Sequence, residues 1–242
     1  MISFDKEKMI KSAKVVEADT LEKFLFRDDI IMALNKQDFR YVISCAYAIS
    51  ESLQRAVVAV FLLSDLDFLS YFEIFPEYFL SALPITEIDI PKNVKVLDTA
   101  ALWGCGLLTS VTIPNSTERI GWATFCYCGA LSKVIFEENS QLTTIFTTAF
   151  SNCVSLKNII IPNRVTSIGE SAFSGCTSLT SIEIPNSVKN IDKYAFYKCS
   201  KLNTIHYKGT KQEWETIHKG KDWADNSGIE KIICIDGEIS LK

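Results

Sequence analysis

The sequence predicts an α+β protein. A helical N-terminal domain (residues 1–84) precedes a repeat solenoid (residues 85–206) and a C-terminal cap (residues 207–242). Two observations carry this prediction: a unit of 23 residues recurs about five times in the middle of the chain, and apolar residues recur at helical spacing before it. A fixed period in this range is typical of solenoids, in which each unit buries its apolar face only against its neighbours.

The first 84 residues do not share the period of the repeat. Apolar residues at helical spacing begin at Met9, and Thr20 is a candidate N-cap for the helix pattern that follows it. Similar patterns continue through QDFRYVISCAYAI, SESLQRAVVAVFLLS, DFLSYFEIF and PEYFLSAL. We therefore expect five or six short helices here, the last of them beginning at Pro76 and covering the first turn of the solenoid.

The repeat follows the pattern L-x-x-I-x-I-P-x-x-V-x-x-I-G-x-x-A-F-x-x-C. Apolar residues two apart predict a strand, and the proline ends it because it has no N–H for a further ladder bond. The third unit lacks the proline and reads FEENSQLTTI where another unit reads IPNSVKNI, so it is two residues longer. The units start at Ile85, Leu108, Leu131, Leu156 and Leu179, and a sixth opens at Leu202.

Stacked units place equivalent residues in ladders. We expect a buried aromatic ladder that starts with Leu102 and continues through Phe125, Phe150, Phe173 and Phe196. One position is cysteine in all five units, which predicts small buried residues rather than disulfides: Cys105, Cys128, Cys153, Cys176 and Cys199. Cys45, Cys126 and Cys234 are dispersed, and Cys126 with Cys128 forms a C-x-C without the second half that a zinc site needs. Gly121 and Gly169 suit a tight corner of the chain.

The last 36 residues are predicted to close the solenoid. Thr210–Ile217 favours one short helix, with Trp214 and Ile217 on its buried side. The apolar segment that follows predicts a hairpin about Asp236-Gly237, because an Asp-Gly pair between two apolar strands favours a tight turn.

The consensus over residues 85–206 resembles the BspA-type leucine-rich repeats, also described as the Treponema pallidum class. Five copies in phase carry the resemblance, with Pro, Ala-Phe and Cys at fixed positions. It implies a leucine-rich repeat solenoid, and the ending IHYKGTKQEWETIHKG followed by ICIDGEISLK is similar to the ends of such arrays. Members of this family often resemble surface or secreted adhesion proteins. The chain departs from the pattern in its third unit, and in its first, which has Leu102 and Trp103.

The charge distribution argues against direct binding of nucleic acid. Residues 1–84 carry 9 basic and 13 acidic side chains, residues 85–206 carry 10 and 9, and residues 207–242 carry 6 and 7. No segment has the basic excess that binding to a phosphate backbone requires. The longest apolar run, Ala56–Leu63, is too short to span a bilayer, and the N-terminus lacks the apolar core of a signal peptide. We therefore expect a cytoplasmic protein without membrane insertion. The resemblance to the BspA-type repeats implies a bacterial or phage origin.

No motif of an enzyme or of a cofactor site stands out, and we predict neither catalytic residues, a metal nor a cofactor. The two histidines, His206 and His218, belong to no recognised catalytic order. Asp65 and Asp67 lie two apart and would diverge on a helix, and Asp28 and Asp29 fit a solvated helix face.

The best candidate site is the open face of the repeat strands. If positions 1, 4 and 6 of each unit point inward, positions 3 and 5 point outward, and Ile135 and Ile160 become adjacent exposed apolar residues. Apolar residues within a polar rim are the usual composition of a protein interface. The candidate partner-binding residues are Glu87, Asp89, Thr112, Lys133, Ile135, Asn158, Ile160, Glu183 and His206.

These features predict a non-catalytic module that binds a protein partner through the concave repeat face, the helical head, or both. Three alternatives remain: an inhibitor that blocks a nucleic-acid-handling defence enzyme with its acidic head, a surface adhesin, and an enzyme housed in the head. The exposed isoleucines could also be covered by the head or a dimer partner, or have no role.

Overall fold

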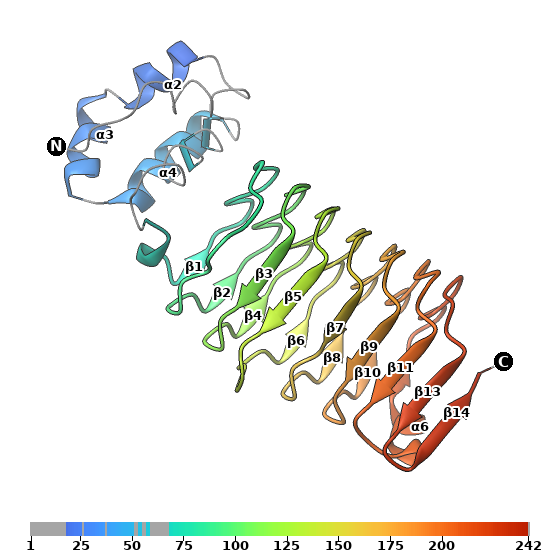
Figure 1. Ribbon diagram of the computed structural model, residues 1–242. Coiled ribbons are helices and arrows are strands. Elements are labelled where there is room, and N and C mark those ends of the chain that lie inside the picture. The colour runs from blue at the N-terminus through green and yellow to red at the C-terminus, as the bar shows by residue number, and fades with distance from the viewer. Residues whose placement is uncertain are drawn as a thin grey trace. The chain divides into compact units, whose positions relative to one another are not determined.

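The computed structural model describes residues 18–25, 27–36, 38–50, 53–54, 57–58 and 68–241 (Figure 1). The chain forms two compact units, which divide between Phe72 and Glu73. This division lies earlier in the chain than the boundary expected at residue 84.

The described part of the first unit contains helices α2 (Ala18–Leu25), α3 (Asp28–Asn35) and α4 (Phe39–Ile49). Asp38 caps α4, because its side chain accepts a hydrogen bond from the backbone N–H of Tyr41 at 3.1 Å. Thr20 lies inside α2, so its predicted role as a cap is wrong. The helix expected from Met9 and most of residues 50–64 lie outside the described residues. The buried apolar side chains of the three helices include Phe24, Leu25, Ile30, Leu34, Phe39, Val42, Ile43 and Ala46.

The second unit is a solenoid, which confirms the predicted repeat architecture. Most of its turns, here called rungs, carry one longer and one two-residue strand (Figure 1). The two-residue strands form a seven-stranded parallel sheet of β1 (Ile74–Phe75), β2 (Val96–Leu97), β4 (Arg119–Ile120), β6 (Thr144–Ile145), β8 (Ser167–Ile168), β10 (Asn190–Ile191) and β12 (His218–Lys219).

The longer strands form two separate sheets. The first pairs β3 (Ser110–Ile113) with β5 (Lys133–Phe136). The second contains β7 (Asn158–Ile160), β9 (Ser181–Ile184), β11 (Thr204–Tyr207) and β13 (Lys231–Cys234) in parallel, and ends with β14 (Gly237–Ser240), which is antiparallel to β13. The ladder of longer strands is therefore interrupted between β5 and β7.

The segment after Pro76 belongs to the solenoid and is not the helix that its spacing predicts. The backbone N–H of Leu80 donates to the carbonyl of Ala101 at 2.7 Å, in the manner of every later rung corner. Phe75 and Phe79 are fully buried, and their ring centroids lie 5.2 Å apart. A rung corner and a helix both place apolar residues three or four apart, so the apolar pattern alone does not separate them.

The aromatic ladder forms as predicted, beginning at the fully buried Leu102. Consecutive rings are parallel to within 7°, with centroids 5.3, 5.4 and 5.6 Å apart, in the order Phe125, Phe150, Phe173 and Phe196. Trp223 meets the last ring edge-on at 6.0 Å and ends the stack.

The five repeat cysteines are fully buried and free, as the repeat predicts. Each thiol donates to a backbone carbonyl of the preceding rung, at Sγ–O distances of 3.1 to 3.2 Å. Burial raises the pKa of Cys105 and of Cys199 to about 12, and it also raises the pKa of Cys128, Cys153 and Cys176 well above the ordinary thiol value. These positions therefore serve packing and a weak hydrogen bond.

Gly121 and Gly169 occupy corners where the backbone of the preceding rung lies too close for a side chain. A Cβ on Gly169 would lie 2.8 Å from the backbone of Phe146 and of Thr147, and one on Gly121 would meet Asp98 at 2.9 Å. Both glycines lie at corners, as the repeat predicts, and the close contact between rungs explains why a side chain would not fit at these two positions.

The C-terminal cap also forms as predicted. Helix α6 (Lys211–Thr216) starts with a capping box between Thr210 and Glu213. Trp214 and Ile217 are buried. The ammonium of Lys219 donates to the carbonyls of these two residues at 2.8 and 3.0 Å, and burial lowers its pKa. The hairpin of β13 and β14 places Cys234 opposite Gly237.

Candidate functional site

The ladder face comprises the side chains at the third and fifth positions of each repeat unit. Strand alternation directs them outward, while the fourth position, such as Val111 or Ile159, is buried. Of the candidate residues, Glu183 is half-buried. The others are exposed: Glu87, Asp89, Thr112, Lys133, Ile135, Asn158, Ile160 and His206. The predicted orientation of these positions is confirmed.

The ladder face is interrupted at the longer third unit. The backbone N–H of Ser132 donates to Thr109, and that of Thr180 donates to Lys157, both at 2.9 Å. The equivalent bond from Lys157 to Ser132 is absent, and β5 is not paired with β7. On the opposite side of the same two rungs, β6 and β8 remain paired. The two rungs therefore separate only on the side of the longer strands, where the additional residues lie.

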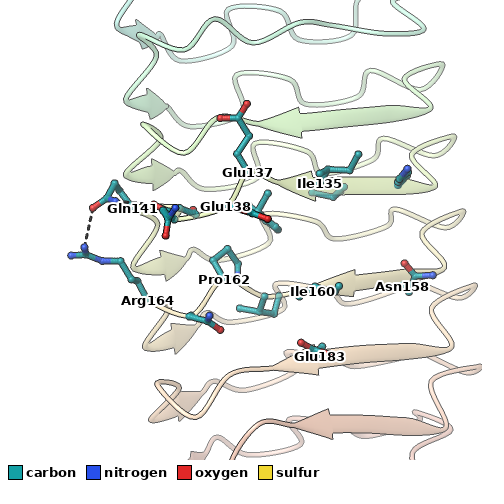
Figure 2. Close-up of a pocket in the computed structure, with 16 residues that line it drawn as sticks. Ile135, Glu137, Glu138, Gln141, Asn158, Ile160, Pro162, Arg164 and Glu183 are labelled. Atoms are coloured by element: carbon teal, nitrogen blue, oxygen red, sulfur yellow. Dashed lines mark hydrogen bonds between the residues drawn. The ribbon is translucent and has the colours of Figure 1, made fainter.

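A pocket of about 610 Å³ lies at this interruption (Figure 2). Ile135 on β5 and Ile160 on β7 line it, with 39% and 63% of their surfaces exposed. The loop Glu137–Gln141, which contains the additional residues, forms one wall, and Pro162 and Arg164 contribute to another. The two isoleucines that the repeat pattern placed on neighbouring strands thus share one pocket, although their strands are not hydrogen-bonded.

Several polar groups of the pocket are held by neighbouring rungs. The guanidinium of Arg164 donates to the side-chain oxygen of Gln141 at 2.9 Å (Figure 2). The carboxylate of Glu137 accepts from the backbone N–H of Asn115 at 3.1 Å. Glu183 forms an ion pair of 2.8 Å with Lys208. These contacts fix the walls, while the isoleucine side chains remain accessible between them.

Not all the candidate residues meet at this pocket. Lys133, Ile135, Asn158, Ile160 and Glu183 line it. The remaining four, Glu87, Asp89, Thr112 and His206, lie on the ladder face but not in the pocket lining. Sequence reasoning did not include the loop Glu137–Gln141 or Arg164, although the two additional residues of the third unit mark the loop in the sequence.

The acidic residues of the first unit do not assemble a site in its described part. Arg27 forms a bidentate ion pair with Asp29, with contacts of 2.7 and 3.1 Å, and the hydroxyl of Tyr41 donates to the same carboxylate at 3.3 Å. The hydrogen bond from Arg27 lowers the pKa of Asp29. The pair is exposed, as a solvated helix face predicts. Asp65 and Asp67 lie outside the described residues.

The described residues contain no group of three or more His, Cys, Asp or Glu side chains that could hold a metal ion. None of their helices has both the length and the apolar character needed to cross a membrane.

A family model decides the classification of the chain. The model described as "BspA type Leucine rich repeat region (6 copies)" matches residues 51–145 and 123–220. The chain belongs to this family. The resemblance seen in the repeat consensus is therefore confirmed, and the match covers more than half of the sequence. No curated protein matches this chain.

Three solved structures of bacterial proteins are similar to this chain. A leucine rich cell surface protein from Faecalibacterium prausnitzii is 38% identical with a TM-score of 0.53, over 55% of this chain and 35% of its own. A leucine-rich repeat protein from Eubacterium ventriosum is 23% identical with a TM-score of 0.58, over 67% and 44%. The T. pallidum leucine rich repeat protein is 28% identical with a TM-score of 0.49, over 59% and 71%. The chain thus spans less than half the length of the first two.

Proposed function

We propose that this protein is a non-catalytic binding module, and that its ladder face recognises a protein partner around the pocket between β5 and β7. The observation that carries the proposal is the pair of accessible isoleucines, Ile135 and Ile160, within a polar rim. A partly desolvated apolar centre with polar surroundings is where interface energy concentrates. Leucine-rich repeat proteins are generally interaction or surface modules, which supports the same class of function.

A capture experiment tests the proposal. The full chain and the variant Ile135→Glu with Ile160→Glu are used as baits in a lysate of the source organism or of its host. Thr143→Glu with Thr166→Glu is the matched control, because it adds the same charge at exposed residues next to β6 and β8. We expect a partner bound by the native chain and the control but lost from the isoleucine variant, since two buried carboxylates would disrupt the apolar contact.

A further bait in the same experiment, a chain of residues 73–242, tests the second compact unit by itself. It retains β1 and the complete first rung, which a chain beginning at residue 84 would lack. A partner bound by residues 73–242 assigns recognition to the solenoid. A partner kept by the isoleucine variant but lost without residues 1–72 would assign it to the first unit and contradict the proposal.

A surface protein is the second candidate, and one observation favours it. The solved structure from F. prausnitzii that is 38% identical is named a cell surface protein. Our proposal instead assigns the module a cytoplasmic location. Fractionation of the source cells distinguishes the two candidate functions. Protein found in the cytosol supports the intracellular binding module. Protein that protease reaches on intact cells supports the surface candidate.

A further inference from the structure

The charged residues of the pocket are ordered along the strand direction. Lys133 lies at the start of β5, Ile135 in its middle, and Glu137 and Glu138 follow its end. Ile160 occupies the equivalent repeat position at the end of β7, and Figure 2 shows the two isoleucines between Glu138 on one side and Asn158 on the other. The pocket thus has a cationic end, an apolar centre and an anionic end.

Only some of these charges are available to a partner. Glu137 accepts from the backbone of Asn115 and lies 3.9 Å from the ammonium of Lys92, and Glu183 is paired with Lys208. Arg164 donates to the neutral Gln141 and keeps its positive charge, at the same end of the pocket as Glu137 and Glu138. Lys133 and Glu138 are both exposed, and neither forms an ion pair or a side-chain hydrogen bond with another described residue. Lys133 and Glu138 therefore supply charges of opposite sign at the two ends of the apolar centre, and the end with Glu138 stays negative because Glu137 and Glu138 outnumber Arg164 there.

We propose that the pocket between β5 and β7 binds an extended segment of a partner protein that carries one apolar side chain between an acidic and a basic residue. The apolar side chain would lie between Ile135 and Ile160, the acid beside Lys133 and the base beside Glu138. Residues of an extended strand rise about 3.3 Å each, in the ligand as in β5. The acid and the base of the ligand would therefore lie about two residues before and after its apolar residue. This inference rests on the proposed function and specifies its ligand.

Charge complementarity supports this ligand over simpler ones. An apolar segment without charges would leave Lys133 and Glu138 close to an interface without counter-charges, which costs affinity. A segment with two like charges would place one of them beside a pocket residue of the same sign, either Lys133 or Glu138, and the repulsion would lower the affinity. A phosphate backbone is also disfavoured, because three carboxylates line the pocket: Glu137, Glu138 and Glu183.

Synthetic peptides test the inference with the full chain. Each fluorescein-labelled peptide has a central leucine in a Gly-Ser background, with charged residues two positions before and after it. One set carries Asp and Arg in either order, a second carries Arg twice, and a third carries Asp twice. A further peptide replaces the leucine of the first set by serine. Fluorescence anisotropy at protein concentrations up to about 1 mM covers the weak binding expected of one short segment.

The native chain should bind the Asp–Arg peptides three- to fivefold more tightly than the like-charged peptides, the factor that one exposed ion pair contributes at about 1 kcal/mol or less. Lys133→Glu should transfer the preference to the Arg–Arg peptide, and Glu138→Lys to the Asp–Asp peptide. Lys189→Glu is the control for net charge and should leave the preference unchanged, because Lys189 does not line the pocket. Ile160→Glu and the serine peptide should both abolish binding.

Three results would overturn the inference. Equal affinity of the native chain for all the leucine peptides, or unchanged preference in the two charge variants, would show that the charges do not select the ligand. Absence of binding of every leucine peptide up to 1 mM would also contradict it. If a partner protein is still captured in a manner that depends on Ile135 and Ile160, the inference fails while the proposed function stands. If no such partner exists but the peptides bind as expected, the proposed function fails instead.

Discussion

At the scale of single residues, the repeat cysteines show how one side chain can serve two purposes. The cysteine fills a small space between rungs and donates its thiol hydrogen as a second hydrogen bond to a carbonyl that also accepts a backbone N–H, as Phe125 accepts from Cys128 and from the thiol of Cys153. The neutral thiol is required for both roles, because a thiolate has no proton to donate and is poorly solvated in the core. The raised pKa values follow from this environment.

Alkaline pH should therefore destabilise the solenoid. Cysteines of the unfolded chain lose their protons near the ordinary pKa of 9.0, while Cys105 and Cys199 hold theirs in the folded state up to a pKa of about 12. Between these two pKa values the folded state binds more protons than the unfolded chain, so the free energy of unfolding falls as the pH rises. The fall is about 1.4 kcal/mol per pH unit for each thiol between pH 9 and 12, and these thiols have no effect below pH 9. Urea titrations from pH 8 to 11 measure the slope. The variant Cys105→Ala with Cys199→Ala should show a shallower slope, and an identical one would count against this explanation.

The stacked phenylalanines give a second prediction at this scale. Phe150 is fully buried between two parallel rings, so Phe150→Ala should lower the free energy of unfolding by about 3–5 kcal/mol. Phe146, on the same rung, is only half-buried, and Phe146→Ala should cost clearly less. Urea unfolding of the two variants gives the comparison, and equal losses would show that the stack adds nothing to stability.

At the scale of elements, the pocket follows from two additional residues. They lengthen the connection after β5, and the ladder bonds between β5 and β7 are lost there while β6 and β8 stay paired. Other units close the same connection with a proline turn, such as the bond from the N–H of Val165 to the carbonyl of Pro162 at 3.0 Å. An irregular unit in an otherwise regular array has thereby produced a recess.

Shortening this loop should close the pocket. Deletion of Glu138 and Asn139 combined with Glu137→Pro restores a unit of 23 residues. We expect β5 and β7 to pair, which would raise the free energy of unfolding by about 1–2 kcal/mol if two ladder hydrogen bonds form. Partner capture should be lost at the same time. Glu138→Gln, which keeps the loop length, is the control for stability. A shortened chain that binds its partner as before would contradict the role given to the pocket.

Much of the fold could be predicted because the repeat assigns a place to each residue. Phe150, Cys153 and Ile160 were each predicted as core or surface from their position in the unit. The first rung was mistaken for a helix because Phe75, Phe79 and Leu83 are spaced as on a helix face. The pocket wall at Glu137–Gln141 was missed for another reason: the insertion was visible, but its effect on the separation of two strands depends on how the rungs stack.

At the scale of the whole molecule, the solenoid begins at Glu73 and is closed by the cap at its C-terminal end. A chain of residues 73–242 should therefore unfold cooperatively. A chain of residues 84–242 lacks the buried Phe75, Phe79 and Leu80, and should be less stable by at least about 3 kcal/mol, the cost of truncating one large core side chain. Urea unfolding of the two chains measures the difference. Equal stabilities would mean that the first rung is not part of the cooperative unit.

The central claim is that the solenoid binds its partner where the ladder of longer strands is interrupted. Hydrogen–deuterium exchange of the full chain, with and without the captured partner, tests it most directly. We predict that slowed exchange on binding is concentrated in residues 131–142 and 156–165, which form both sides of the pocket. Slowed exchange confined to residues 18–58, with the pocket unchanged, would contradict the account.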